Sequence, residues 1–229
     1  MRRIAMRAGL AVLAALVFSL SAGAMTATDV AERLRDRIVV DWKVKNLEVT
    51  VAPYSQAETE RGRFKSITVR ADSAEKGGIA MRPMYVKGTD VVLDLGMLFS
   101  PGSRVETKYR GATEMYIELS EEDMNEGLRQ AQDVVPDLKA TLQNGQITLT
   151  GTYKLLVGNK FKMSGRLEVP DGYKINFVPT AAKVNGIPVP VSAVKTLLSR
   201  LNPILDLSTV VMKPRISSLT IEDGKLTAK

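Results

Sequence analysis

The chain has 229 residues, with 32 Lys and Arg against 25 Asp and Glu, a formal net charge of +7, and neither cysteine nor histidine. Without cysteine, its stability cannot depend on disulfides and must come from a hydrophobic core. The two absences exclude zinc sites built from Cys and His, and catalysis by Ser-His-Asp or Cys-His groups. We expect neither a metal nor a cofactor.

The first 24 residues have the three parts of a cleavable secretory signal. Arg2, Arg3 and Arg7 precede an apolar stretch from Ala8 to Leu20 and small residues at positions 22–24. The apolar stretch is shorter than the roughly 20 residues that a membrane-spanning helix needs. We therefore expect export to the periplasm or another extracytoplasmic compartment. Residues 1–24 are then removed, and residues 25–229 form a single soluble domain.

Removal of this segment would change the charge of the protein. It leaves 29 basic residues against 25 acidic ones, a net charge of +4. Such a small positive net charge, without a dense run of basic residues, argues against nucleic acid as a partner. It is compatible with transient contact with an anionic membrane surface.

The mature chain is predicted to begin with a short amphipathic helix. Asp29 is the expected cap, and Val30, Leu34 and Ile38 recur at four-residue spacing on one face. From residue 44 to residue 119, apolar and polar residues mostly alternate, which predicts half-buried strands.

A second helix is predicted to begin after Ser120. The Ser120 hydroxyl can cap it, Asp123 occupies the capping-box position, and Leu119 can pack on Met124. The acidic first turn complements the helix dipole. The apolar stripe of this helix consists of Met124, Leu128, Ala131 and Val135, and Pro136 ends it.

Strands resume at residue 138 and alternate clearly over residues 147–155 and 161–169. Asn144-Gly145 and Asp171-Gly172 are hairpin signals between these runs, so the sheet is predicted to be antiparallel. A third helix is expected from about Pro190 to Leu205, with a kink or an end at Pro203. Two short strands, around residues 216–221 and at 226, close the chain through Asp223-Gly224.

No motif in the sequence specifies an enzyme. Ser192 and Lys195 match the S-x-x-K signature of penicillin-binding enzymes, but Ser73 and Lys76 match it equally well, and no K-T-G or S-D-N follows. Phosphate-binding and dinucleotide-binding glycine motifs do not occur either. We therefore predict no catalytic residues. A hydrolase that uses a Ser-Lys pair is kept as a third alternative.

The sequence resembles the LmeA-like phospholipid-binding family of bacterial envelope proteins, which is akin to the tubular lipid-binding fold of bactericidal/permeability-increasing protein. The resemblance rests on a strand that runs into a capped helix at residues 116–128, and on Leu201-Asn202-Pro203-Ile204-Leu205-Asp206-Leu207. The closing hairpin and the Asn144-Gly145 and Asp171-Gly172 turns agree in position.

This resemblance implies an α+β fold. A long, strongly curved antiparallel sheet would wrap around amphipathic helices and enclose an elongated apolar channel for acyl chains. Gly111, Gly151 and Gly165, inside strand-like runs, are candidate bends of such a sheet. Exposed Lys154, Lys160, Lys162 and Lys174 are candidates for contact with lipid head groups. The candidate lipid-binding residues are Ile147, Leu149, Tyr153, Leu155, Phe161, Met163, Leu167, Val169, Val194, Leu197, Leu198, Leu201 and Ile204.

The expected function is therefore non-enzymatic binding, and transfer, of phospholipid or another acyl-chain lipid in the cell envelope. The alternative is a structural or assembly module of the envelope, with a closed core and a protein partner of unknown identity. Apolar periodicity alone does not separate the two, because a packed core and a lipid channel are lined by the same residue types.

Overall fold

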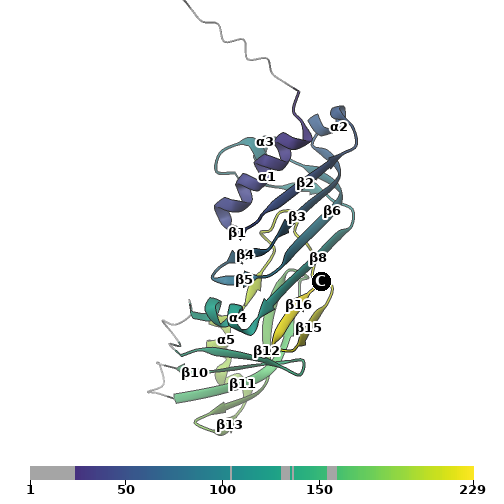
Figure 1. Ribbon diagram of the computed structural model, residues 1–229. Coiled ribbons are helices and arrows are strands. Elements are labelled where there is room, and N and C mark those ends of the chain that lie inside the picture. The colour runs from purple at the N-terminus through teal and green to yellow at the C-terminus, as the bar shows by residue number, and fades with distance from the viewer. Residues whose placement is uncertain (1–23, 104, 130–134, 136, 154–158) are drawn as a thin grey trace, which may run out of the picture.

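The computed structural model describes residues 24–103, 105–129, 135, 137–153 and 159–229. The predicted signal covers residues 1–24, of which residues 1–23 lie outside these ranges. The described part is an α+β structure made mostly of antiparallel strands, as the sequence predicts (Figure 1). Among the described residues, none of the helices combines the length and the apolar character needed to cross a bilayer.

The first large sheet is seven-stranded and combines amino-terminal strands with the last two strands of the chain. Its order is β15-β16-β8-β6-β3-β2, and β7 pairs with β6. All of its pairings are antiparallel. The strands are β2 (Glu48–Pro53), β3 (Arg63–Ala71), β6 (Met84–Leu93), β7 (Thr107–Tyr109), β8 (Thr113–Ser120), β15 (Leu219–Glu222) and β16 (Lys225–Ala228). A three-stranded sheet beside it has the order β1-β4-β5, with β1 (Lys43–Lys45), β4 (Ser73–Lys76) and β5 (Ile79–Met81).

The second large sheet is six-stranded, with the order β13-β12-β11-β10-β9, and β14 pairs with β12. The described strands are thus divided among three sheets, where the resemblance implies one long sheet. The predicted glycine turn Asn144-Gly145 joins β9 to β10, with positive φ at both residues, as a type I′ hairpin requires. The strands are β9 (Lys139–Gln143), β10 (Gln146–Tyr153), β11 (Asn159–Glu168), β12 (Lys174–Val184), β13 (Ile187–Val189) and β14 (Leu205–Asp206).

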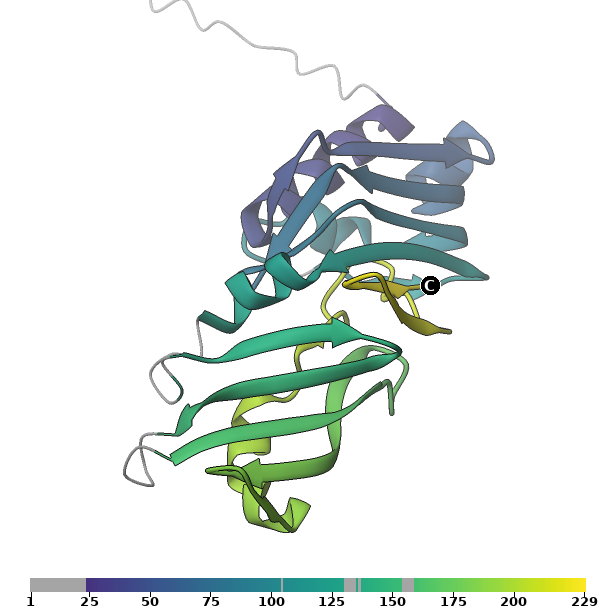
Figure 2. The same cartoon turned by 60° about the horizontal axis from the view of Figure 1, so that its bottom comes forward.

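The closing hairpin connects the two large sheets. Strand β16 extends the first sheet by pairing with β8, and β15 approaches the β9–β10 turn, where the Gly145 N–H donates to the Ile221 carbonyl at 3.2 Å. In both ribbon views this hairpin lies between the two sheets (Figures 1 and 2). The buried apolar residues of both sheets belong to one packed cluster.

Helix α1 (Ala27–Asp41) begins earlier than predicted, which corrects the assignment of Asp29 as its cap. Thr26 is the N-cap, and its hydroxyl accepts the Asp29 N–H at 3.2 Å, while the Asp29 carboxylate accepts the Thr26 N–H at 2.7 Å. Asp29 is therefore the third helical residue of a capping box. The predicted stripe of Val30, Leu34 and Ile38 is buried, and α1 packs beside β2.

Helix α4 (Glu121–Leu128) has the predicted capping box, formed by Ser120 and Asp123. The buried Asp123 carboxylate also pairs with Arg82 at 2.9 Å. Leu119 and Met124 are both fully buried, which agrees with the predicted contact. Ala131 and Pro136, from the predicted end of this helix, lie outside the described residues, whereas Val135 is described and buried.

The third helix is shorter than predicted. A 3-10 turn, η3 (Val191–Val194), leads into α5 (Lys195–Leu201), and Leu205 already belongs to β14. A proline disfavours helical backbone at the residue before it, so Pro203 ends the helix rather than kinking it. The Asn202 side chain then pairs with the Phe177 backbone, accepting its N–H at 2.8 Å and donating to its carbonyl at 2.9 Å.

Two five-residue helices interrupt the amino-terminal strands and were not predicted. Ser55 caps α2 (Gln56–Glu60), and Asp94 caps α3 (Leu95–Phe99). Helices of this length show no apolar periodicity, so caps alone could have indicated them. Arg33 and Arg37 on α1 donate to the Leu98 carbonyl at the end of α3, at 3.1–3.2 Å, which fixes α3 against α1.

Candidate functional site

The predicted lipid-binding residues lie together in the second half of the fold. The described members come from β10, β11 and the residue after β11, and from η3, α5 and the residue after Pro203. They all belong to the same packed cluster. The buried members are Ile147, Leu149, Phe161, Met163, Val194, Leu197, Leu201 and Ile204, and the half-buried ones are Tyr153, Leu167, Val169 and Leu198. Leu155 lies outside the described residues.

A cavity of about 790 Å³ lies elsewhere, in the amino-terminal half. None of the twelve described members of the predicted set is among its lining residues. Its volume is in the range of small-molecule sites, about 300–1,000 Å³. The apolar part of its wall consists of Ile38, Val40, Trp42, Val69, Met84, Val86, Val105, Val210, Val211 and Met212. The other lining residues are Arg37, Asp41, Lys76, Gly102, Ser103, Glu106, Thr107, Asp206, Ser208, Thr209 and Lys213.

Four parts of the chain build this wall. The last turn of α1 and Trp42 form one side, and β3 and β6 contribute Val69, Met84 and Val86 from the buried face of their alternating pattern. Residues 102–103, residues 105–107, which lead into β7, and the segment at residues 206–213 complete it. In Figure 1, the yellow-green chain between α5 and β15 passes behind the amino-terminal sheet.

Several contacts hold the 206–213 segment in place. Arg110 donates to the Met212 carbonyl, and its other terminal nitrogen lies 3.2 Å from the Tyr173 hydroxyl. Met212 and Lys213 both have positive φ, of 67° and 40°, in the left-handed region that side chains other than glycine seldom adopt. Tertiary contacts therefore impose this turn, because the local sequence does not favour it.

The close approach of this segment to the sheet depends on Gly88 in β6. A Cβ atom at Gly88 would lie 2.8 Å from the Met212 sulfur. The missing side chain lets Met212 pack directly on the strand beside the cavity.

Trp42 lines the cavity and is the only tryptophan of the chain. Its ring is buried, and the Lys76 ammonium lies 5.0 Å from the ring centroid, within cation–π range. Lys76 also donates to the Thr209 hydroxyl, so it links β4 to the 206–213 segment.

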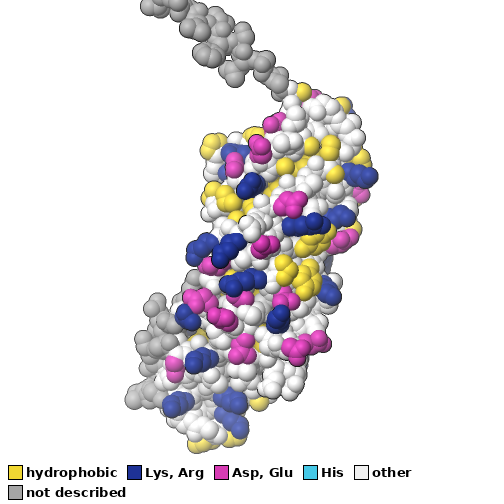
Figure 3. All heavy atoms as spheres, viewed as in Figure 1, with side chains coloured by type: hydrophobic (Ala, Val, Ile, Leu, Met, Phe, Trp, Pro, Cys, Tyr) yellow, Lys and Arg dark blue, Asp and Glu magenta, His cyan; other side chains and the backbone are white. Residues whose placement is uncertain are grey.

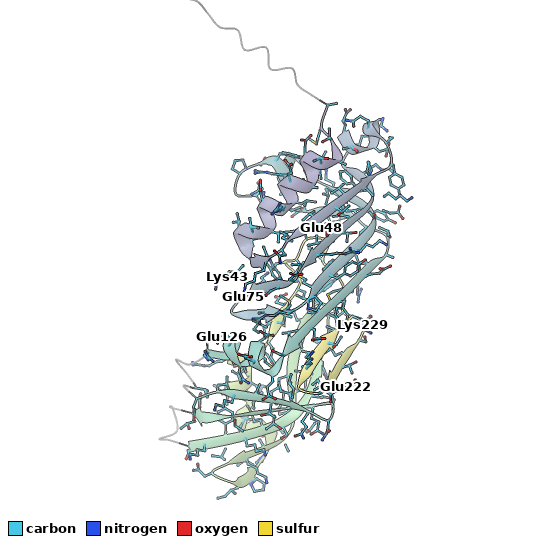
Figure 4. All side chains as sticks on the ribbon, viewed as in Figure 1. Lys43, Glu48, Glu75, Glu126, Glu222 and Lys229 are labelled. Carbon is cyan, nitrogen blue, oxygen red and sulfur yellow. The ribbon has the colours of Figure 1, made fainter. Side chains whose placement is uncertain are left out.

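A second hollow of about 340 Å³ shares four lining residues with the first, namely Val40, Asp41, Trp42 and Lys76. The Lys43–Glu75 ion pair, at 2.7 Å, joins β1 to β4 among its lining residues (Figure 4). Val40 is 80% exposed although it lines both hollows, so this end of α1 presents apolar surface at an opening.

The charged residues of the cavity wall are balanced in sign. The lining includes three cationic residues, Arg37, Lys76 and Lys213, and three acidic ones, Asp41, Glu106 and Asp206. Burial alone would raise the pKa of Asp206, but hydrogen bonds from Ser208 and the charges of Lys174 and Lys76 lower this pKa below its ordinary value. Asp206 is therefore a carboxylate at neutral pH.

The arrangement suits binding better than catalysis. Small-molecule sites combine apolar lining residues with a smaller number of polar groups. The wall of this cavity contains both kinds of residue. Among the described residues, no group of three or more Asp and Glu side chains could hold a metal ion. Ser192 and Lys195 of the S-x-x-K match are both exposed on η3 and α5, away from the cavity.

Sequence reasoning missed this cavity because its wall combines distant segments. Two local signals were present. The run Val210-Val211-Met212 is apolar without helix or strand periodicity, and the end of the first helix adds Val39 and Val40 off its buried stripe. Each signal indicates apolar surface that the local element does not bury.

The fold and the cavity define an α+β protein with room for a hydrophobic ligand. A family model described as LmeA-like phospholipid-binding matches residues 19–229, nearly the whole chain. The chain therefore belongs to the LmeA-like phospholipid-binding family, as the resemblance indicates. Comparisons with curated proteins and with solved structures found no significant match.

Proposed function

We propose that this protein is a non-enzymatic phospholipid carrier and that it holds an acyl chain in the cavity beside Trp42. Its membership of a phospholipid-binding family and the 790 Å³ cavity, whose wall includes ten apolar residues, support this function. An acyl chain of about 16 carbons has about 12 kcal/mol of hydrophobic free energy at stake, at roughly 0.8 kcal/mol per methylene group. An acyl chain held against the apolar residues of the cavity wall avoids part of that cost, whereas an acyl chain released into water does not.

The polar residues of the wall suit the other end of such a ligand. Ser103, Thr107 and Ser208 offer hydroxyl groups, and the exposed Lys213 offers a cation. A phosphodiester placed there would keep its hydration and gain charge-assisted hydrogen bonds, while the acyl chain is buried. The head group thus remains at the border of the cavity.

We further propose that the carrier acts in the bacterial cell envelope. The signal-like residues 1–24 support export to the periplasm, with residues 25–229 as a single soluble domain. The sheets would curve around the helices, and the cavity would be one part of an elongated channel that opens when a lipid enters. The apolar face of the second sheet, with the predicted lining residues, would receive a further length of acyl chain.

Leu198→Trp tests this extension to the second sheet. Leu198 is half-buried, so an indole there is expected to occupy acyl-chain space and to reduce bound phospholipid more than it reduces stability. Lipid content would be measured by organic extraction and mass spectrometry, and stability by urea unfolding. A loss of stability with unchanged lipid per folded molecule would place Leu198 in the ordinary core.

Trp42 fluorescence tests the cavity itself. Since Trp42 lines the cavity, binding of a phospholipid with bromine-labelled acyl chains is expected to quench most of its emission. Trp42→Phe should abolish the signal and keep the lipid content measured by mass spectrometry. A well-folded protein that neither contains phospholipid nor responds to the labelled lipid would favour the alternative, an envelope assembly module with a closed core.

A further inference from the structure

The charge of the chain is distributed unevenly between the two halves of the fold. Residues 25–137 contain 16 Lys and Arg against 20 Asp and Glu, a net charge of −4. Residues 138–206, which include the second sheet, η3 and α5, contain nine against three, a net charge of +6. The small net charge of the whole mature chain therefore combines an acidic amino-terminal part with a strongly basic second sheet and its helices.

The outer face of the second sheet carries opposed lysines. Lys162 on β11 lies directly opposite Lys183 on β12, and both are exposed. Among the described residues neither has an acidic partner within ion-pair distance. Like charges directly opposite on neighbouring strands destabilise a sheet. A surface that retains such a pair is suited to a negatively charged partner.

The end of the same sheet carries an exposed aliphatic side chain beside its lysines. The β12–β13 hairpin turns at Asn185-Gly186, and Ile187, the next residue, is 67% exposed. Lys183 is on one face of this hairpin, and Lys195 begins α5 close after it in the chain. Figure 3 shows dark-blue and yellow side chains at the lower end of the molecule, where Figure 1 places β13, with no magenta among them.

We propose that this end of the second sheet, defined by Lys162, Lys183, Lys195 and Ile187, docks on the anionic head-group surface of a phospholipid membrane. The inference deepens the proposed function, because a lipid carrier must approach a bilayer. Lysines next to an anionic surface gain affinity from its potential, and an exposed aliphatic side chain can enter the boundary with the acyl region. The net negative amino-terminal half would be repelled, which orients the molecule with β13 toward the membrane.

The chemistry of this surface favours a membrane over nucleic acid. Proteins that bind single strands use exposed aromatic rings as stacking platforms. The exposed aromatic residues of the described chain are Tyr54, Phe99 and Tyr109, all in the amino-terminal half. The basic end presents an isoleucine instead.

The test is co-sedimentation of the purified protein with vesicles, at low and at high salt. Vesicles of phosphatidylglycerol and phosphatidylcholine in equal parts are expected to bind it, and phosphatidylcholine alone is not. The double variant Lys162→Gln, Lys183→Gln should bind the mixed vesicles about 30-fold more weakly, at about fivefold per lysine. Lys45→Gln with Lys65→Gln removes the same charge from exposed positions on β1 and β3, and should leave the affinity unchanged.

A second pair of variants tests the apolar contact. Ile187→Ser is expected to weaken vesicle binding about tenfold, and Ile187→Leu to preserve it. Equal losses in the two double variants would overturn the proposal, since net charge alone would then explain binding. Binding to single-stranded RNA as tight as to vesicles, with no effect of Ile187→Ser, would also overturn it.

Vesicle binding by the docking surface can be measured separately from lipid binding in the cavity. The Lys162→Gln, Lys183→Gln variant should keep its extractable phospholipid and the Trp42 response to dispersed labelled lipid. If the protein binds vesicles but contains no lipid, the carrier function is refuted and the docking surface stands. If the protein contains lipid but does not bind vesicles, the docking surface is refuted and the carrier function stands.

Discussion

Val211→Trp is expected to lower the phospholipid content of the purified protein by more than tenfold. Val211 is half-buried in the cavity wall on the 206–213 segment, so an indole there can extend into the space that the acyl chain would occupy. Excluding only two methylene groups costs about 1.6 kcal/mol, which corresponds to more than a tenfold loss of affinity. Organic extraction and mass spectrometry of the folded protein would measure the effect.

Val49→Trp is the matched control. Val49 is also a half-buried valine next to the core, but it lies on β2 and does not line the cavity. Its substitution should leave the phospholipid content unchanged. If both variants lose lipid equally, or if Val211→Trp keeps the lipid of the parent protein, the cavity beside Trp42 is not the binding site.

Gly165→Ala adds a single methyl group and is expected to lower the free energy of unfolding by about 3 kcal/mol or more. Gly165 lies at an irregularity of β11, where the register with β12 shifts between Ser164 and Gly165. An added Cβ would lie 2.2 Å from the Val178 carbonyl oxygen and 2.6 Å from the Pro179 Cα. Both are backbone atoms that cannot rotate away, so the two strands must separate.

Gly96→Ala provides the comparison for this prediction. Gly96 is exposed in α3, and the nearest atom to an added Cβ is an Asp94 carboxylate oxygen at 3.2 Å. Alanine also has the better helix propensity, by about 1 kcal/mol. Urea unfolding followed by circular dichroism should therefore show little change or a gain for Gly96→Ala. A similarly small change in the free energy of unfolding for Gly165→Ala would contradict the close approach of β11 and β12 at Gly165.

Local patterns predicted local structure well. The Ser120–Asp123 capping box, the buried stripe of α1 and the glycine turns all follow from interactions within a few residues, and the structure contains them. One error was also local. Asp29 was expected to cap the first helix, but the Thr26 hydroxyl is an acceptor three residues earlier and leaves the Asp29 carboxylate to complete the capping box.

The position of the cavity depends on contacts between segments that are far apart in the sequence. The apolar faces of β10, β11 and α5 predicted a lipid-binding set, and the structure brings its described members into one packed cluster. The cavity instead lies where the end of α1, β3 and β6 meet the 206–213 segment. Periodicity shows which face of an element avoids water, but it does not show which distant segment covers that face.

The sequence by itself determined the α+β class, the antiparallel pairing, the family and the absence of disulfides, because each depends on composition, on short-range periodicity or on motifs along the chain. Only the tertiary structure decided where the interior stays hollow and where charge gathers. Val69 and Val211 line the same cavity. Burial of apolar surface is non-directional, so an apolar run in the sequence does not specify which distant segment will cover it. The lysines of β11 and β12 likewise form one basic face only because strand register places Lys162 opposite Lys183.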